Sequence, residues 1–208
     1  MILPTRPSRV VCCAVALFAT AYLLSVQPTA AQQSPSPLAI KPVAEKKLAQ
    51  LPKGPLYWRI EALPTLSDAQ AAAGPTALAA EVSGKAWLFT LGPRGGATPG
   101  ATKVAEVGPV PLLNAPEILL RINHANGPPG ARTPVHTHPG SEAFYVLAGR
   151  LGQRTPHGTS FAEAGQAMNG HGADMPMEVF SAGTTPLDQL VMFVVDATRP
   201  FSSPAKFE

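Results

Sequence analysis

Residues 130–149 read GARTPVHTHPGSEAFYVLAG and carry two histidines and a glutamate at the spacing i, i+2 and i+6. On a β-strand His136 and His138 would point to the same face, because successive side chains alternate. Pro139-Gly140-Ser141 is typical of a turn, and Glu142 then begins a second segment rich in β-forming residues. Two imidazoles and a carboxylate directed into one cavity are a ligand set for a divalent transition metal.

This stretch resembles the first signature motif of the cupin superfamily: glycine, five residues, His-x-His, three or four residues, glutamate, six residues, glycine. Its fixed positions are matched by Gly130, His136, His138, Glu142 and Gly149. The resemblance implies a jelly-roll barrel in which the two histidines and the glutamate hold one divalent metal. That metal is Fe, Mn, Ni, Zn or Cu, and the residues do not select among them.

The second cupin motif, which supplies a third histidine, is matched only in part. Ser181–Pro186 resembles its Pro-Gly turn, and counting back four residues puts Met177 where the histidine is expected. Met177 is either a soft thioether ligand, which favours copper, or filler of a methionine-rich core. His171 lies six residues too early, and it is either a further ligand or an exposed loop residue.

The alternation of the segment after the turn predicts which side chains line the cavity. Phe144 and Val146 share parity with Glu142 and are expected to form its wall. Met177 and Met192 are expected to add to a methionine-lined interior. An apolar cavity with a few convergent polar groups is typical of a small-molecule site.

A second alternating segment contains His124. It shares parity with Ile118, Leu120 and Ile122, a face interpreted as barrel interior, so His124 is expected to line the pocket or to be a satisfied buried histidine. Tyr145 and Leu147 point away from Glu142, toward the second sheet or the partner subunit of a homodimer.

The rest of the chain favours an all-β fold with little helix, a single cupin-type double-stranded β-helix, or jelly-roll barrel. The chain has 24 prolines and 18 glycines, and only Leu66–Ala73 has the pattern of a helical turn. Short strands are expected at 76–82, 86–91, 103–107, 117–123, 132–138, 142–151, 159–164, 177–182 and 189–196.

The N-terminus is typical of a cleaved signal peptide over residues 1–31. Arg6 and Arg9 precede the apolar run Val10–Val26, and Thr29-Ala30-Ala31 is a small-residue cleavage site. We expect a flexible leader at 32–54, with a short helix near Val43–Leu51, followed by one barrel domain at 55–208. The protein would be secreted or periplasmic, without a stable membrane anchor after cleavage.

Composition excludes some partners. The chain carries 16 basic and 13 acidic residues; without Arg6 and Arg9 the balance is nearly neutral, and no basic run interleaved with aromatics suggests nucleic acid. We therefore expect an exported metal-dependent enzyme of the oxygenase type acting on a small organic substrate. The alternative is a cupin that binds a ligand or metal without catalysis. No catalytic residue is identified beyond the motif.

Overall fold

The computed structural model describes Met1 and residues 36–207, so the expected signal peptide lies outside the described residues except for Met1. No helix in the described part is both long and apolar enough to cross a membrane. The elements are β1 (Ala39–Leu48), β2 (Tyr57–Leu63), α1 (Leu66–Ala72), β3 (Ala77–Val82), β4 (Lys85–Gly92), β5 (Thr102–Val107), β6 (Ile118–Gly127), β7 (His136–Thr137), β8 (Gly140–Ala148), β9 (Arg150–Thr155), β10 (Gly158–Glu163), β11 (Ala167–Asn169), β12 (Glu178–Ser181), β13 (Leu187–Asp196) and β14 (Ser203–Pro204).

A five-stranded antiparallel sheet, here called the central sheet, organises the molecule in the order β1-β6-β13-β8-β11. A second sheet has the order β10-β9-β12. The bridge between His136 and Met177 brings β7, with its partner β14, to the β12 edge of that sheet. From β6 to β13 the strands alternate between two facing sheets except at the hairpin β9–β10, which is the arrangement of a jelly roll. The expected all-β jelly-roll fold is confirmed.

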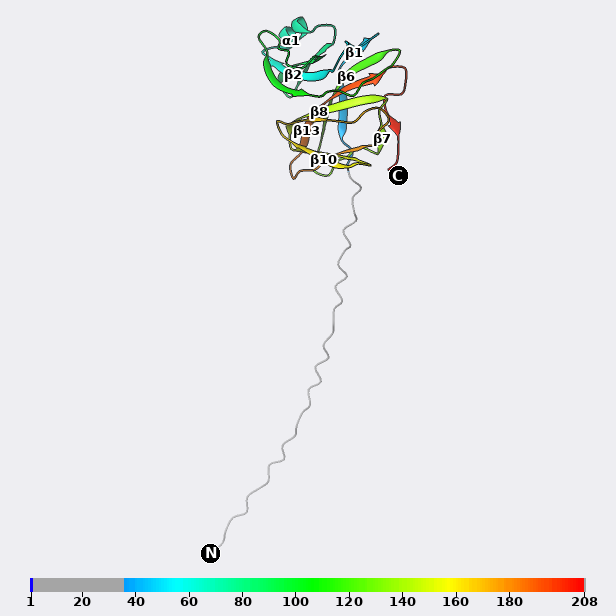
Figure 1. Cartoon of the computed structure of the whole chain (residues 1–208). Helices are drawn as coiled ribbons and strands as arrows, with labels where there is room; N and C mark the ends of the chain where they lie inside the picture. Colours follow the sequence, from blue (N-terminus) through cyan, green and yellow to red (C-terminus); the bar gives the residue numbers. More distant parts are fainter. Residues whose placement is uncertain (2–35, 208) are drawn as a thin grey trace. The chain divides into compact units, whose positions relative to one another are not determined.

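An additional four-stranded sheet, the outer sheet, covers the other face of the central sheet. Its order is β3-β4-β2-β5, and α1 packs on it. In Figure 1 β2 and α1 lie at one end of the molecule and β7 and β10 at the other, with β8 and β13 between them. One apolar core lies between the outer and central sheets, and it includes Trp58, Phe89 and Leu120. A second core fills the jelly roll and includes Phe144, Leu151 and Phe193.

The outer sheet corrects the expected barrel boundaries of 55–208. Residues 57–107 build the outer sheet and α1, and the jelly-roll strands are β1 together with those from Ile118 onward. Tyr145, for which a homodimer partner was one alternative, packs instead against Trp87 of the outer sheet, with ring centroids 6.0 Å apart. Composition could not show this division, because both parts consist of short strands and turns.

The expected flexible leader at 32–54 is wrong for residues 39–48, and no helix forms near Val43–Leu51. These residues form β1, which pairs antiparallel along β6 from Ala39–Asn126 to Leu48–Ile118. The lysines and the proline of β1 interrupt the alternation that would predict a strand. Such residues are typical of an edge strand, where they prevent pairing with a strand of another molecule. Lys46 donates hydrogen bonds to the carbonyls of Gly74 and Ala77, which ties β1 to the outer sheet.

The other expected strands agree with the observed ones to within a few residues. The exceptions are 132–138, of which only His136–Thr137 is a strand, and 142–151, which divides into β8 and β9 at Gly149. Gly149 has a φ of +75°, and a Cβ there would lie 2.4 Å from the carbonyl oxygen of Pro186. The last glycine of the motif is therefore required by the turn that lets β9 leave the central sheet.

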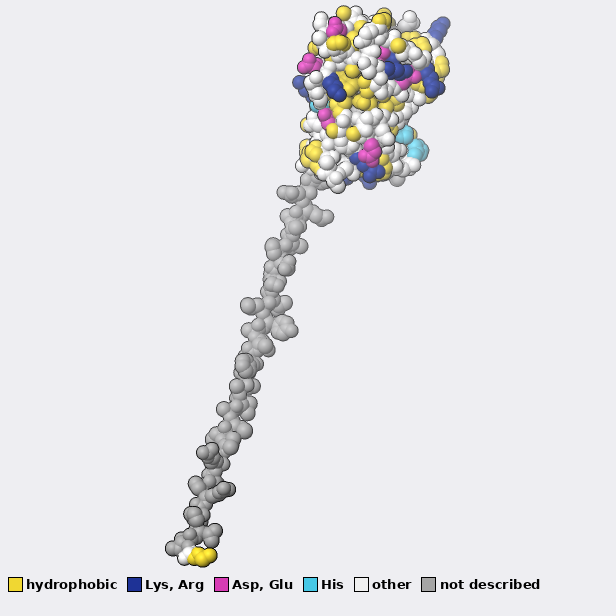
Figure 2. All heavy atoms as spheres, turned by 90° about the vertical axis from the view of Figure 1, so that its left-hand side faces the viewer, with side chains coloured by type: hydrophobic (Ala, Val, Ile, Leu, Met, Phe, Trp, Pro, Cys, Tyr) yellow, Lys and Arg dark blue, Asp and Glu magenta, His cyan; other side chains and the backbone are white. Residues whose placement is uncertain are grey.

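Charges on the surface are mixed. Figure 2 shows a face on which Lys and Arg side chains are interspersed with Asp and Glu. Exposed ion pairs of the described residues include that of Lys47 with Glu117 at 2.8 Å. This agrees with the nearly neutral balance read from the sequence, and it gives no extended basic field on that face.

We predict that β1 is required for stability. A chain that begins at Gln50 should lose about 3 kcal/mol of unfolding free energy relative to a chain that begins at Ser34, because it lacks buried Leu38 and the partly buried apolar residues of β1. Urea denaturation followed by circular dichroism measures the difference. Equal unfolding midpoints for the two chains would show that β1 adds nothing to the barrel.

Candidate functional site

The jelly roll encloses a cavity of about 420 Å³, a volume in the range of small-molecule sites. All three residues of the predicted metal set face it, and most of the remaining wall is apolar. The cavity is lined by Leu38, Ile40, Asn123, Ala125, Thr133, Pro134, Val135, His136, His138, Glu142, Phe144, Val179, Gln189, Val191, Phe193, Phe201, Ser202 and Pro204.

The two imidazoles are held in one tautomer by backbone carbonyls. His136 Nδ1 donates to the carbonyl of Pro134 at 2.8 Å, and His138 Nδ1 donates to that of Phe201 at 2.6 Å. A carbonyl oxygen can only accept, so the proton of each neutral ring lies on Nδ1 and the lone pair of Nε2 stays available. The ring centroids are 4.9 Å apart and nearly perpendicular. A hydrogen bond from Nδ1 to a carbonyl, with Nε2 left available, is the arrangement common among histidines that bind a metal.

Glu142 lies beside His138, deep in the barrel. Its Oε2 atom is 3.9 Å from His138 Nε2, and both side chains are buried. Burial raises the pKa of Glu142 to about 8, although the hydrogen bond from Gln153 lowers it in part. Burial, with smaller effects of His136 and Arg121, lowers the pKa of His138 to about 4 against the opposing hydrogen bond to Phe201. At neutral pH the metal-free pair is therefore uncharged.

Gln153 is a site residue that the sequence reasoning missed. Its Nε2 atom donates to Glu142 Oε1 at 2.6 Å and lies 3.6 Å from the sulfur of Met177. The side chain is buried on β9, on the same face as Leu151 and Thr155. A polar residue at an inward position of an alternating strand was the available signal. Gln153 orients the carboxylate from the side of the barrel where the third histidine was expected.

The donor set fits a divalent metal in its chemistry. A separation of 3.9 Å between His138 Nε2 and Glu142 Oε2 is close to twice the usual metal–ligand bond of about 2.0–2.2 Å, so one ion could contact both atoms. His136 offers a further Nε2 atom from the same cavity wall. Within residues 36–207, however, no three His, Cys, Asp or Glu side chains converge into a preformed metal-binding group. The metal role of the three residues stays a prediction.

The two candidates for a further ligand lie outside the cavity wall. The ring of His171 is 6.3 Å from that of His157, measured between centroids, and does not line the cavity. Its neighbour Gly170 packs against Glu142, where a Cβ would lie 2.7 Å from Glu142 Cγ. Met177 is fully buried and contacts Gln153. This burial agrees with the packing role that was one of the two interpretations of Met177, and a ligand role for either residue stays a prediction.

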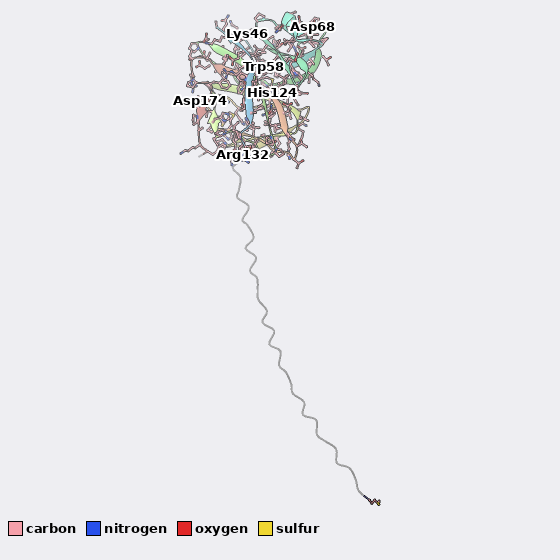
Figure 3. The ribbon with its side chains drawn as sticks, turned by 180° about the vertical axis from the view of Figure 1, so that it is seen from behind. Lys46, Trp58, Asp68, His124, Arg132 and Asp174 are labelled. Atoms are coloured by element: carbon pink, nitrogen blue, oxygen red, sulfur yellow. The ribbon has the colours of Figure 1, made fainter. Side chains whose placement is uncertain are left out.

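Of the predicted wall residues, Phe144 lines the cavity, whereas Val146 lies in the jelly-roll core behind it. His124 and Met192 do not line the cavity as predicted, whereas the hydrogen bond of His124 agrees with its other interpretation as a satisfied histidine. Met192 packs in the core between the central and outer sheets, and His124 lies on the same face of β6 as Ile122, paired with Asp188. Figure 3 shows His124 at mid-height, with Trp58 above it and Arg132 at the lower end. Both faces of the central sheet are buried, so alternation separated the faces but could not say which one is the cavity.

The C-terminal segment completes the site. β14 pairs with β7, which places Pro204 opposite His136. Phe201 packs with Phe193 and His138, and the three ring centroids lie 4.8–4.9 Å apart. Because Phe201 follows His138 by 63 residues, the contact between them was not visible in the sequence.

No family model matches the chain, and no curated protein matches it. Parts of several solved structures are similar to it. A DMSP lyase from Ruegeria pomeroyi is 21% identical over 41% of this chain and 43% of that chain, with a TM-score of 0.36. A cupin-like protein from Thermotoga maritima is 16% identical over 42% and 65%, with a TM-score of 0.38. A variant of salicylate 1,2-dioxygenase from Pseudoaminobacter salicylatoxidans, in complex with gentisate, is 20% identical over 35% and 19%, with a TM-score of 0.31.

The match covers less than two thirds of each of these chains. At such identities the similarity concerns the fold, and the activities belong to those proteins.

We predict that the metal-free protein loses stability between pH 6.5 and 8. The pKa of Glu142 is raised in the folded state to about 8 and is near 4.5 when exposed, so over this range the folded chain holds a proton that the unfolded chain has lost. The contribution of Glu142 to the free energy of unfolding is fully present below pH 4.5. It falls by about 1.4 kcal/mol per pH unit until pH 8. The pKa of His138 is lowered in the folded state, so this residue makes the free energy of unfolding rise with pH, but only below about pH 6.5.

Chemical denaturation at pH 6.5, 7.2 and 8.0 measures this slope, and Glu142→Gln should remove it. Glu163→Gln, at an exposed position, is the matched control and should keep the wild-type slope. An equal slope in wild type and Glu142→Gln would contradict the assignment.

Proposed function

We propose that this protein is an exported metal-dependent cupin enzyme of the oxygenase type that acts on a small organic substrate. One observation carries the proposal: two imidazoles with available Nε2 atoms and a buried carboxyl face the same apolar cavity. A site of this form leaves coordination positions for substrate on the cavity side. The jelly-roll fold alone does not select the reaction, because it hosts many chemistries.

His136, His138 and Glu142 would hold the metal, which when bound supplies Lewis-acid or redox chemistry. The carbonyls of Pro134 and Phe201 orient the two imidazoles. Gln153 orients the carboxylate by its hydrogen bond to Oε1. The rings of Phe193 and Phe201 pack against that of His138 and surround it with apolar surface at this end of the cavity. The neutral state of His138 at physiological pH keeps its Nε2 lone pair free for coordination.

A cupin that binds a ligand or metal without catalysis is the second candidate. It is favoured by the position expected for a third histidine, where Met177 is buried and contacts Gln153 instead of facing the cavity. The two candidates differ in turnover. Oxygen uptake by the metal-loaded protein with small phenolic compounds would support the enzyme, and tight binding without turnover would support the second candidate.

Export is also part of the proposal. It is supported by Arg6 and Arg9, the apolar run Val10–Val26 and the Thr29-Ala30-Ala31 site. We predict that the processed chain begins near Gln32. N-terminal sequencing of the protein recovered outside the cytoplasm tests this, and recovery of an intact Met1 would contradict it.

We predict a graded loss of metal affinity. His138→Ala or Glu142→Ala should abolish stoichiometric metal, because two donors hold a divalent ion poorly against water. Gln153→Leu keeps the ligands and removes only the hydrogen bond to Glu142, so metal should bind about 10–100-fold more weakly. Metal content by mass spectrometry and competition titration with a chelator measure both effects.

His157→Ala and His171→Ala are the matched controls, since these histidines lie outside the cavity wall. Both should keep the wild-type metal content. Full metal content in His138→Ala would show that the motif residues are not a metal site, whereas loss of metal in His171→Ala would make His171 a ligand.

A further inference from the structure

Two buried amides face the cavity without partners. Asn123 is 3% exposed and Gln189 is 0% exposed, and both line the cavity. Asn123 Oδ1 and both Gln189 Oε1 and Nε2 have no hydrogen-bond partner among the described residues. Buried polar atoms of this kind are rare in native folds, because each has lost its hydration without replacement. Three such atoms, on two side chains that line one cavity, indicate groups that a ligand can satisfy.

Strand register places these amides away from the predicted metal ligands. On β13, Phe193 is opposite Glu142, while Val191, two residues earlier, is opposite Asn123. Gln189 is two residues earlier again. With about 3.4 Å per residue along a strand and about 4.8 Å between strands, the backbone of Asn123 is roughly 12 Å from that of Glu142 and that of Gln189 roughly 14 Å. Because side chains on one face of a sheet project in the same direction, the two polar ends of the cavity are separated by about the same distance. A para-substituted aromatic ring with a hydrogen bond at one end and a metal bond at the other spans a distance of this order.

The wall between the two ends is apolar. Phe144, Val191, Ala125 and Val179 line it, and no Lys or Arg is among the cavity-lining residues. An anionic group near the amides would therefore be desolvated without a counter-charge. A neutral group with both a donor and an acceptor would match what Asn123 and Gln189 offer.

We propose that Asn123 and Gln189 form a specificity subsite that binds the neutral hydrogen-bonding end, a hydroxyl or a carboxamide, of a substrate with a flat apolar body. The opposite end of that substrate reaches His136, His138 and Glu142. The proposal deepens the proposed function by naming the substrate class, and it rests on the same cavity. It does not need the metal, because the amides and the apolar wall are present in the metal-free chain.

The test uses four aromatic probes of similar size: benzamide, phenol, benzoate and toluene. Binding to the metal-free protein is measured by calorimetry or by ligand-observed NMR. Benzamide and phenol should bind at least about tenfold more tightly than benzoate. Gln189→Met and Asn123→Leu preserve side-chain volume and remove the polar atoms, so each should weaken benzamide about tenfold and leave toluene unchanged or tighter.

Gln166→Met, at an exposed position outside the cavity, is the matched control and should bind all probes as wild type does. Removal of the unpartnered atoms should keep or raise the melting temperature, so a folded variant is available for the comparison. Equal weakening of benzamide and toluene would overturn the proposal, as would tighter binding of benzoate. Unchanged benzamide affinity in both variants would also overturn it and would assign the amides to ordered water.

The same probes separate this proposal from the proposed function. If His138→Ala loses metal but binds benzamide as wild type does, both stand. If the wild-type protein takes up no metal yet shows the probe pattern, the metal-dependent function fails and the subsite stands. If metal is bound and the probe pattern is absent, the subsite fails and the metal site stands.

Discussion

The pairing of β13 with both β6 and β8 is the interaction on which the rest of the structure depends. β13 is the middle strand of the central sheet, and its register sets which side chains of the three strands share a row. Phe193 beside Glu142, and Val191 beside Phe144 and Asn123, follow from that register. A shift by one residue would turn every one of these side chains to the opposite face. Glu142 at one end of the cavity and the two amides at the other therefore face the same space because β13 pairs in a fixed register with both β6 and β8.

Burial of both faces of the central sheet fixes the register of β13, because a shift would expose apolar side chains or bury polar ones. The outer sheet covers one face, and the jelly-roll strands cover the other. The cavity itself is loosely filled and carries buried polar groups that reduce stability, namely Glu142, Asn123 and Gln189. The core around the fully buried Trp58 and Phe89 lies on the side away from the cavity. This division lets one layer supply stability while the other keeps space and unsatisfied polar groups for a ligand.

The candidate site combines local and distant contributions. His136, His138 and Glu142 come from one short stretch, but their orientation depends on Phe201 and Gln153. The carbonyl of Phe201 fixes the tautomer of His138, and Gln153 holds the carboxyl of Glu142. The contact from Phe201 is made by a backbone carbonyl, which any residue could offer, so its residue type carries no signal in the sequence. Gln153 acts through its side-chain amide, and strand packing decides that this amide meets Glu142.

The sequence by itself determined the all-β class, most strand positions, the helical turn at α1 and the facing of His136, His138 and Glu142 into one cavity. Alternation and turn residues are local properties of the sequence. The alternating residues of β8 could therefore be recognised without knowledge of any distant contact. Only the tertiary structure decided that β1 is a strand, that His124 and Met192 face the outer sheet, and that Asn123 and Gln189 line the cavity. The physical reason is that alternation assigns a residue to one of two faces, whereas the layer that covers each face is set by strands far away in the chain.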